Sequence, residues 1–187
     1  MEIEMKTRII VDSTSDLAGD MKERVSVVPL TVHFGDEEYI DGVTIDHKTF
    51  YEKLIENNIL PTTSQATPAM FEEQFEKVKA AGESAVVITL SSKFSGTYQS
   101  AMIAASEYDN IYVVDSESVA VGGGILAELA LRYLDEGMEA GEIAAKLEEE
   151  KKKIISLVVT KVNGRIPIVL GLGGNCTRTV SYTHLTL

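Results

Sequence analysis

The sequence is short of several features that would assign it to a specialised class. Its one cysteine, Cys176, excludes an internal disulfide framework and a zinc site built on cysteines. No run of about 20 uninterrupted apolar residues occurs, so no membrane-spanning helix is expected. The amino terminus has no basic stretch followed by an apolar stretch, so no secretion signal is predicted either. These absences together predict a cytoplasmic protein.

Positive charge is also scarce over most of the chain. The net charge is −12 at pH 7, yet residues 151–187 contain six Lys or Arg and no Asp or Glu, so residues 1–150 alone carry −18. A surface of this sign repels nucleic acid and anionic membranes. The charge therefore argues against a role in binding polyanions for the main body of the protein.

Short apolar runs alternate along the chain with helical patterns, over a length that suits one core and a short appendage. We predict strands at residues 7–11, 25–34, 85–90, 111–115 and 154–160, and helices at residues 16–24, 47–56, 68–82, 97–107, 125–134 and 140–153. Residues 37–42 are predicted to return as a hairpin arm, and residues 61–66 to form a loop. This alternation indicates an α/β fold, a mostly parallel sheet with helices on both faces.

Local signals mark where several of these helices begin. Ser15, Asp46 and Thr67 are predicted to cap the first three helices. The glycine run at residues 122–124 leads into the helix at 125–134, whose small residues suit close packing on the sheet.

Three turns rich in hydroxyl groups are predicted to meet at one end of the sheet, at residues 12–15, 62–65 and 91–97. Ligands of open α/β sheets bind beyond the carboxyl ends of the strands, where free N–H groups at a helix start attract an anion. Ser and Thr hydroxyls add donors that can surround a carboxylate or a phosphate. One such turn is ordinary turn chemistry, but three together predict an anion site. His33 and His47 are interpreted as surface residues, with no catalytic or metal role.

Five segments together resemble the DegV family over about residues 6–155. They are Asp12-Ser13-Thr14, Pro29-Leu30, Thr63-Ser64-Gln65, residues 90–101 and Val113-Val114-Asp115-Ser116. Members of this family are bacterial fatty-acid-binding proteins and include the carrier subunits of fatty acid kinase. The resemblance implies two domains that enclose one long-chain fatty acid, with the acyl tail in a tunnel of the first domain and the carboxylate near the domain junction.

The resemblance also implies roles for individual residues. Thr63 and Ser95 would hydrogen-bond the fatty-acid carboxylate, and Ser64, Ser92 and Gly96 would shape that pocket. The carrier would be non-catalytic, with no cofactor and no metal. It would pass the carboxylate to a separate ATP-dependent kinase subunit, which makes acyl phosphate for phospholipid synthesis.

The second domain of the family is not recognisable in this sequence. Residues 5–155 are predicted to form the DegV-like lipid-binding domain, and residues 156–187 a remnant or aberrant tail in place of the second domain. Residues 163–166 resemble the start of the family's second domain only weakly, and His184 does not match its histidine.

Some functional interpretations stay open. Met70, Phe71, Phe75 and Met102 are candidates for the tunnel wall, although such stripes usually pack as ordinary core. An alternative function is phosphoryl transfer that uses Asp12 and the loop at residues 91–97. A third possibility is an interaction module whose acidic face docks a basic partner. A serine hydrolase is disfavoured because Ser95 lacks the Gly-x-Ser-x-Gly frame.

Overall fold

The computed structural model describes residues 6–56 and 59–162, which form an α/β body and a smaller arm. The body contains a four-stranded parallel sheet in the order β2-β1-β6-β7. Its strands are β1 (Thr7–Asp12), β2 (Ser26–Val28), β6 (Ser84–Thr89) and β7 (Ile111–Asp115). Every residue of β6 is buried, as expected for a central parallel strand covered on both faces.

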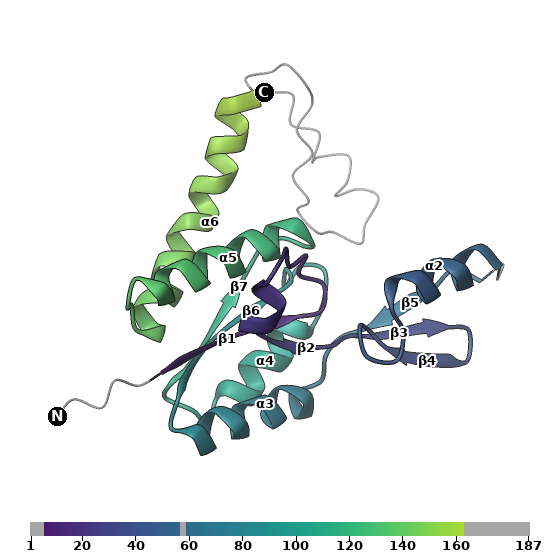
Figure 1. Cartoon of the computed structure of the whole chain (residues 1–187), viewed down its shortest axis with the longest axis horizontal. Helices are drawn as coiled ribbons and strands as arrows, with labels where there is room; N and C mark the ends of the chain where they lie inside the picture. Colours follow the sequence, from purple (N-terminus) through teal and green to yellow (C-terminus); the bar gives the residue numbers. More distant parts are fainter. Residues whose placement is uncertain (1–5, 57–58, 163–187) are drawn as a thin grey trace.

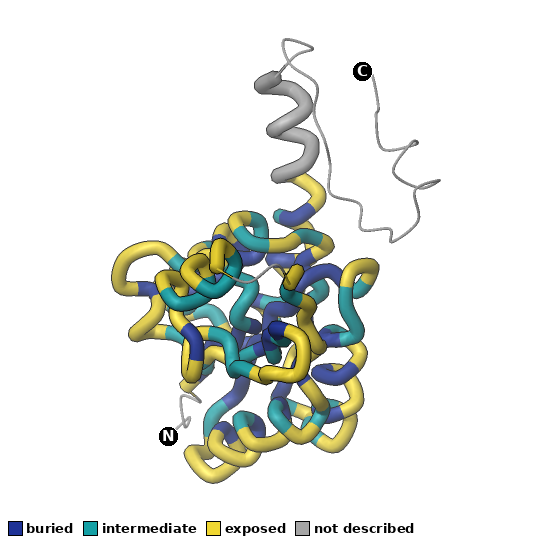
Figure 2. Tube along the Cα trace, turned by 90° about the vertical axis from the view of Figure 1, so that its right-hand side faces the viewer, coloured by how far each residue is buried: buried dark blue, intermediate teal, exposed yellow. Residues whose placement is uncertain are grey.

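Helices cover both faces of this sheet (Figure 1). They are α1 (Met21–Arg24), α3 (Pro68–Ala81), α4 (Thr97–Ala105), α5 (Val121–Asp135) and α6 (Ala140–Val162). Because side chains alternate along a strand, Ile9 and Val11 pack with α5 and α6, whereas Ile10 packs with α3 and α4. Figure 2 shows the buried segments gathered inside the body. The predicted α/β fold with helices on both faces is confirmed.

A three-stranded antiparallel sheet with one helix forms the arm, which projects to the right of the body in Figure 1. Its strands are β3 (Thr31–Phe34), β4 (Glu37–Ile40) and β5 (Thr62–Ser64), in the order β4-β3-β5, and its helix is α2 (His47–Glu56). Val32, Phe34 and Ile45 make a small core of their own with Phe50 and Leu54. The arm therefore has packing that is separate from that of the body.

The prediction of one strand over residues 25–34 is wrong. The chain leaves the parallel sheet after Val28 and enters the arm at Thr31. Pro29 has no N–H to donate, and the N–H of Leu30 donates to Ser13 Oγ at 3.0 Å instead of to a ladder partner. Residues 61–66, predicted as a loop, contain β5, which pairs with β3.

The prediction of a strand at residues 154–160 is also wrong, since α6 continues to Val162. A short apolar run cannot be assigned to strand or helix by periodicity alone. No helix among the described residues is long and apolar enough to cross a bilayer.

Of the three predicted helix caps, Asp46 is confirmed, Thr67 is confirmed in position only, and Ser15 is wrong. Asp46 does cap α2, because its Oδ1 accepts the N–H of Thr49 at 2.7 Å. Ser15 caps no helix, since α1 starts only at Met21, and it pairs instead with Ala120 in an isolated bridge. Thr67 precedes α3 without a capping side-chain hydrogen bond.

The glycine run allows α5 to begin against the turn after β1. A Cβ at Gly124 would overlap the backbone oxygen of Asp16, whereas a Cβ at Gly123 would meet only the hydroxyl of Ser15, at 2.9 Å. Gly124 is therefore the position where the backbone itself is the obstacle, a contact that the sequence did not predict.

We predict that Gly124→Ala lowers the free energy of unfolding by about 1–3 kcal/mol, because overpacking must push α5 away from the β1 turn. Gly123→Ala is the matched control, since the Ser15 hydroxyl can rotate away and alanine favours a helix over glycine. Urea unfolding of both variants measures the difference. Equal effects of the two substitutions would show that the contact with Asp16 does not limit the packing.

Candidate functional site

The order of the strands places a topological switch point between β1 and β6. From β1 the chain crosses to β2 on one side, and from β6 it crosses to β7 on the other, so β1 and β6 flank the point where the direction of winding reverses. In open α/β sheets ligands bind outside the carboxyl ends of the strands at such a switch point. The turn after β1 and the loop at residues 90–97 follow the two strands that flank this switch point.

Asp12 joins the two segments. Its side chain is fully buried, and its Oδ2 accepts the N–H of Leu90 at 2.5 Å. Its Oδ1 accepts the N–H of Thr14 at 2.9 Å and the hydroxyl of Thr14 at 2.6 Å. Both carboxylate oxygens are thus engaged within the protein, and the last residue of β1 fixes the start of the loop after β6.

Burial raises the pKa of Asp12 above its ordinary value of 3.8, and the hydrogen bonds from Thr14 and Leu90 only partly offset this effect. A raised pKa in the folded state means that the folded protein binds this proton more readily than the unfolded chain. Between 3.8 and the folded pKa, ionisation of Asp12 therefore makes the free energy of unfolding fall as the pH rises.

We predict that this pH-dependent decrease in the free energy of unfolding is absent in Asp12→Asn, because the asparagine side chain does not ionise. Chemical unfolding of the wild type and the variant across the acidic range would show a difference in their free energies of unfolding that changes with pH. Carbon-detected NMR of the Asp12 carboxyl tests the same point directly, and titration at or below 3.8 would contradict the assignment.

Three backbone N–H groups anchor the loop after β6. Besides the bond from Leu90, the N–H of Ser91 donates to the oxygen of Ser118 at 2.8 Å. The N–H of Ser92 donates to the carboxylate of Asp115 at 3.2 Å. The loop is held from both neighbouring strands, so its remaining groups have a fixed position.

Ser95 lies at the start of α4. Its Oγ accepts the N–H of Thr97 at 3.2 Å and lies 2.9 Å from the hydroxyl of Thr97. Ser95 is half-buried and Thr97 is fully buried. The Ser95 hydroxyl is therefore positioned at a helix N-terminus, where unpaired N–H groups favour an anion.

Gln65 connects the arm to this loop. Its side-chain amide donates to Ser100 Oγ at 3.1 Å, on the first turn of α4. A Cβ at Gly96 would overlap the same amide, so any side chain at this position would displace Gln65 from where the arm meets the loop. The predicted turns at residues 62–65 and 91–97 are in contact at this point.

Thr63 and Ser64 lie beside Gln65 on β5 and are both exposed. Thr63 is paired with Val32 of β3, and its hydroxyl has no hydrogen-bond partner within the described residues. Ser64 is on the opposite face, where its Oγ is 2.8 Å from Nε2 of His33. No hydrogen bond joins Thr63 to Ser95 in the described part of the chain, so their convergence on one ligand stays a prediction.

Three of the four residues proposed for a tunnel wall share one core, and Met102 lies apart from it. Phe71 and Phe75 are fully buried between α3 and the sheet, with ring centroids 6.0 Å apart. Met70 packs at the edge of that core, and Met102 is 45% exposed on α4. Ordinary core packing accounts for the two phenylalanines.

Sequence reasoning missed how the site is supported. Asp115 is predicted from the sequence only as the end of a strand, yet it and Ser118 hold the loop after β6. Gln65 was quoted in a motif without a role. Each of these contacts joins segments that are far apart in the chain. Local sequence patterns therefore do not predict them.

The fold defines an α/β protein in which the turn after β1 and the hydroxyl-rich loop after β6 are joined at a switch point. A family model described as "Uncharacterised protein, DegV family" matches residues 6–167. The chain belongs to the DegV family.

Individual relatives agree with this assignment. A DegV domain-containing protein of Clostridium perfringens is 36% identical over 157 residues, which cover 82% of this chain and 56% of the relative. Protein DegV of Bacillus subtilis is 34% identical over 155 residues, covering 81% and 55% of the two chains. The chain thus spans about half the length of these curated relatives.

Solved structures show the same fold. The crystal structure of DegV from Bacillus subtilis, described as a fatty acid binding protein, matches with a TM-score of 0.73 and 35% identity over 79% of this chain and 54% of that chain. A structure described as fatty acid binding of a DegV family protein from Thermus thermophilus matches with a TM-score of 0.72 and 32% identity, over 79% and 54% of the two chains.

Proposed function

We propose that this chain binds a long-chain fatty acid whose carboxylate is hydrogen-bonded by Thr63 and Ser95. The observation that carries the proposal is the contact of Gln65 with Gly96 and Ser100, which brings the segment of Thr63 to the loop of Ser95. Structures of DegV relatives described as fatty acid binding support the class of ligand.

Neutral donors suit a carboxylate that must later react. Hydroxyl and backbone N–H groups keep the charge solvated without locking it in a bidentate ion pair. Burial of each methylene contributes about 0.8 kcal/mol, so a C16 tail contributes roughly 11 kcal/mol before ordering costs. The tail would supply most of the affinity, and the hydroxyls would fix the position of the head group.

The supporting residues have distinct parts in this proposal. Ser92 keeps the loop in place through its bond to Asp115, and Gly96 leaves room for Gln65. Ser64 would shape the pocket only indirectly, because its hydroxyl is bonded to His33.

We further propose that the protein is a non-catalytic carrier that presents the bound acid to a fatty acid kinase subunit for acyl-phosphate formation. In this proposal residues 5–155 form the lipid-binding domain, and residues 156–187 stand where relatives continue into a second domain. Acyl phosphate formed from palmitate, ATP and a kinase catalytic subunit should increase when this chain is added.

The alternative of phosphoryl transfer is less well supported. Asp12 would have to reach a bound nucleotide or its metal ion, but its side chain is fully buried and both of its oxygens accept hydrogen bonds from the protein.

Native mass spectrometry tests the proposed ligand. We expect protein expressed in bacteria to carry a bound species with the mass of a fatty acid, and delipidated protein to take up palmitate. The same measurement on residues 1–155 shows whether the predicted domain is sufficient. Protein that stays free of lipid after incubation with palmitate would contradict the proposal.

We predict that Thr63→Ala and Ser95→Ala each weaken palmitate binding by about 1–3 kcal/mol, because each removes a donor to a charged group. Thr62→Ala is the matched control, since its side chain lies on the other face of β5 and should leave affinity unchanged. Calorimetric titration gives the affinities, and urea unfolding checks that Ser95→Ala keeps α4 folded. Unchanged affinity in both variants would place the head group elsewhere.

A further inference from the structure

The hydroxyl of Thr97 has one hydrogen-bond partner among the described residues, the hydroxyl of Ser95. The two oxygens are 2.9 Å apart, and the backbone N–H of Thr97 also donates to Ser95 Oγ, at 3.2 Å. Thr97 is fully buried on the first turn of α4, whereas Ser95 is half-buried in the loop after β6. This difference in burial decides which of the two hydroxyls donates.

A hydroxyl group has one proton to donate and two lone pairs that accept. If Ser95 donated to Thr97, the proton of the Thr97 hydroxyl would be buried without an acceptor, and the protein would bear the full desolvation penalty of that donor. If Thr97 donates instead, both groups are satisfied, because the proton of the half-buried Ser95 hydroxyl can reach solvent or a ligand. The Thr97 hydroxyl therefore donates to Ser95 Oγ.

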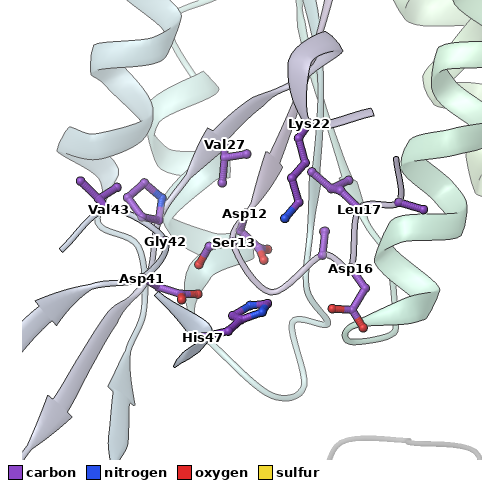
Figure 3. A pocket seen from close by; sticks show the side chains of 13 residues that line it. Asp12, Ser13, Asp16, Leu17, Lys22, Val27, Asp41, Gly42, Val43 and His47 are labelled. Carbon is purple, nitrogen blue, oxygen red and sulfur yellow. The ribbon is translucent and has the colours of Figure 1, made fainter. Parts of the chain in front are cut away.

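The two carboxylates that hold the loop after β6 do not compete for this proton. Both oxygens of Asp12 are engaged within the protein, and Figure 3 shows Asp12 at a pocket beside the turn after β1, together with Asp41 and His47. The carboxylate of Asp115 binds the backbone of the loop. In the described part of the chain neither carboxylate forms a hydrogen bond with Thr97, so Ser95 Oγ is its acceptor.

Both lone pairs of Ser95 Oγ are then occupied, one by the N–H and the other by the hydroxyl of Thr97. The only free hydrogen-bonding group of the Ser95 side chain is its proton, so this side chain can donate to a ligand but cannot accept from one. A carboxylate only accepts and therefore matches it. The proton of an alcohol or an amine finds no acceptor there.

We propose that Thr97 is a positioning residue that makes Ser95 an obligate donor, so that the site selects a carboxylate over an alcohol on the same acyl tail. The role rests on the proposed function, because Ser95 is the residue proposed to bind the fatty-acid carboxylate. Thr97 acts through Ser95 and does not touch the ligand. Threonine suits this role because its β-branched side chain is restricted at χ1, which limits the directions of its hydroxyl.

The direction of this hydrogen bond can be measured without a ligand. In an equal mixture of H2O and D2O, the carbon-13 signal of a serine or threonine Cβ splits when its hydroxyl proton exchanges slowly with solvent. We expect a split Cβ signal for Thr97 and a single one for Ser95. A split signal for Ser95, or a single signal for Thr97, would overturn the assignment of the donor.

Thr97→Val removes the donor and keeps the branched shape of the side chain. We expect it to weaken palmitate binding about fivefold, the scale of one net hydrogen bond. Binding of hexadecanol should be unchanged, because the freed lone pair of Ser95 can accept the proton of the alcohol. Thr97→Ser, which keeps the hydroxyl, should bind palmitate as the wild type does. Equal weakening for both ligands, or unchanged palmitate binding in Thr97→Val, would overturn the proposal.

Thr89→Val is the matched control. Thr89 is another buried threonine, at the end of β6, and its Oγ1 has no hydrogen-bond partner within the described residues. The control should leave the affinity for palmitate unchanged, and an equal loss in Thr89→Val and Thr97→Val would overturn the role of Thr97. A wild type that binds no palmitate would contradict the proposed function instead, and the exchange measurement would still decide the direction of the hydrogen bond.

Discussion

The bond from the N–H of Leu90 to the carboxylate of Asp12 is the interaction on which the functional end of this protein depends. It crosses the switch point of the sheet and links the end of β1 to the loop that carries Ser92 and Ser95. Replacement of one such partner leaves a buried donor unsatisfied, which costs more than the bond itself contributes. The burial that makes the bond stable also disfavours the charge on Asp12 and so raises the pKa of that carboxyl.

Around this link the loop after β6 is fixed from several directions. Asp115 and Ser118 hold its backbone from the β7 side, and Gln65 reaches it from the arm. The arm is connected to the body by the chain around Pro29 and by the chain leading into α3. The position of Thr63 relative to Ser95 therefore depends on how the arm sits on the body, and Gln65 is the side chain that sets this contact.

Much of the body could be predicted from the sequence. The pattern predicted buried strands from the β-branched runs of β1, β6 and β7, and a helix packed on the sheet from the apolar stripe of α3. The structure contains both, so local pattern and global fold coincide there. The arm could not be predicted fully, because Thr62–Ser64 has no apolar alternation and becomes a strand only by pairing with β3. Residues 154–160 were misassigned because a short β-branched run is compatible with either helix or strand.

The sequence indicated the residue types of a candidate site but not the geometry of the segments that carry them, and the assignment of Thr63 and Ser95 to a head group stays a prediction. Hydroxyl groups after successive strands indicated an anion site, and the motifs around Thr63 and Ser95 identified the family. The support from Asp115 and the role of Gln65 depend on segments that are distant in sequence, which a single sequence does not bring together.

The most direct test of the head-group assignment is an NMR titration of the labelled protein with palmitate carrying carbon-13 at its carboxyl. The account predicts that one bound carboxyl signal appears and that the amides of Thr63 and of the turn from Ser95 to Thr97 shift together at the same stoichiometry. Bound palmitate that leaves both segments unshifted would contradict it.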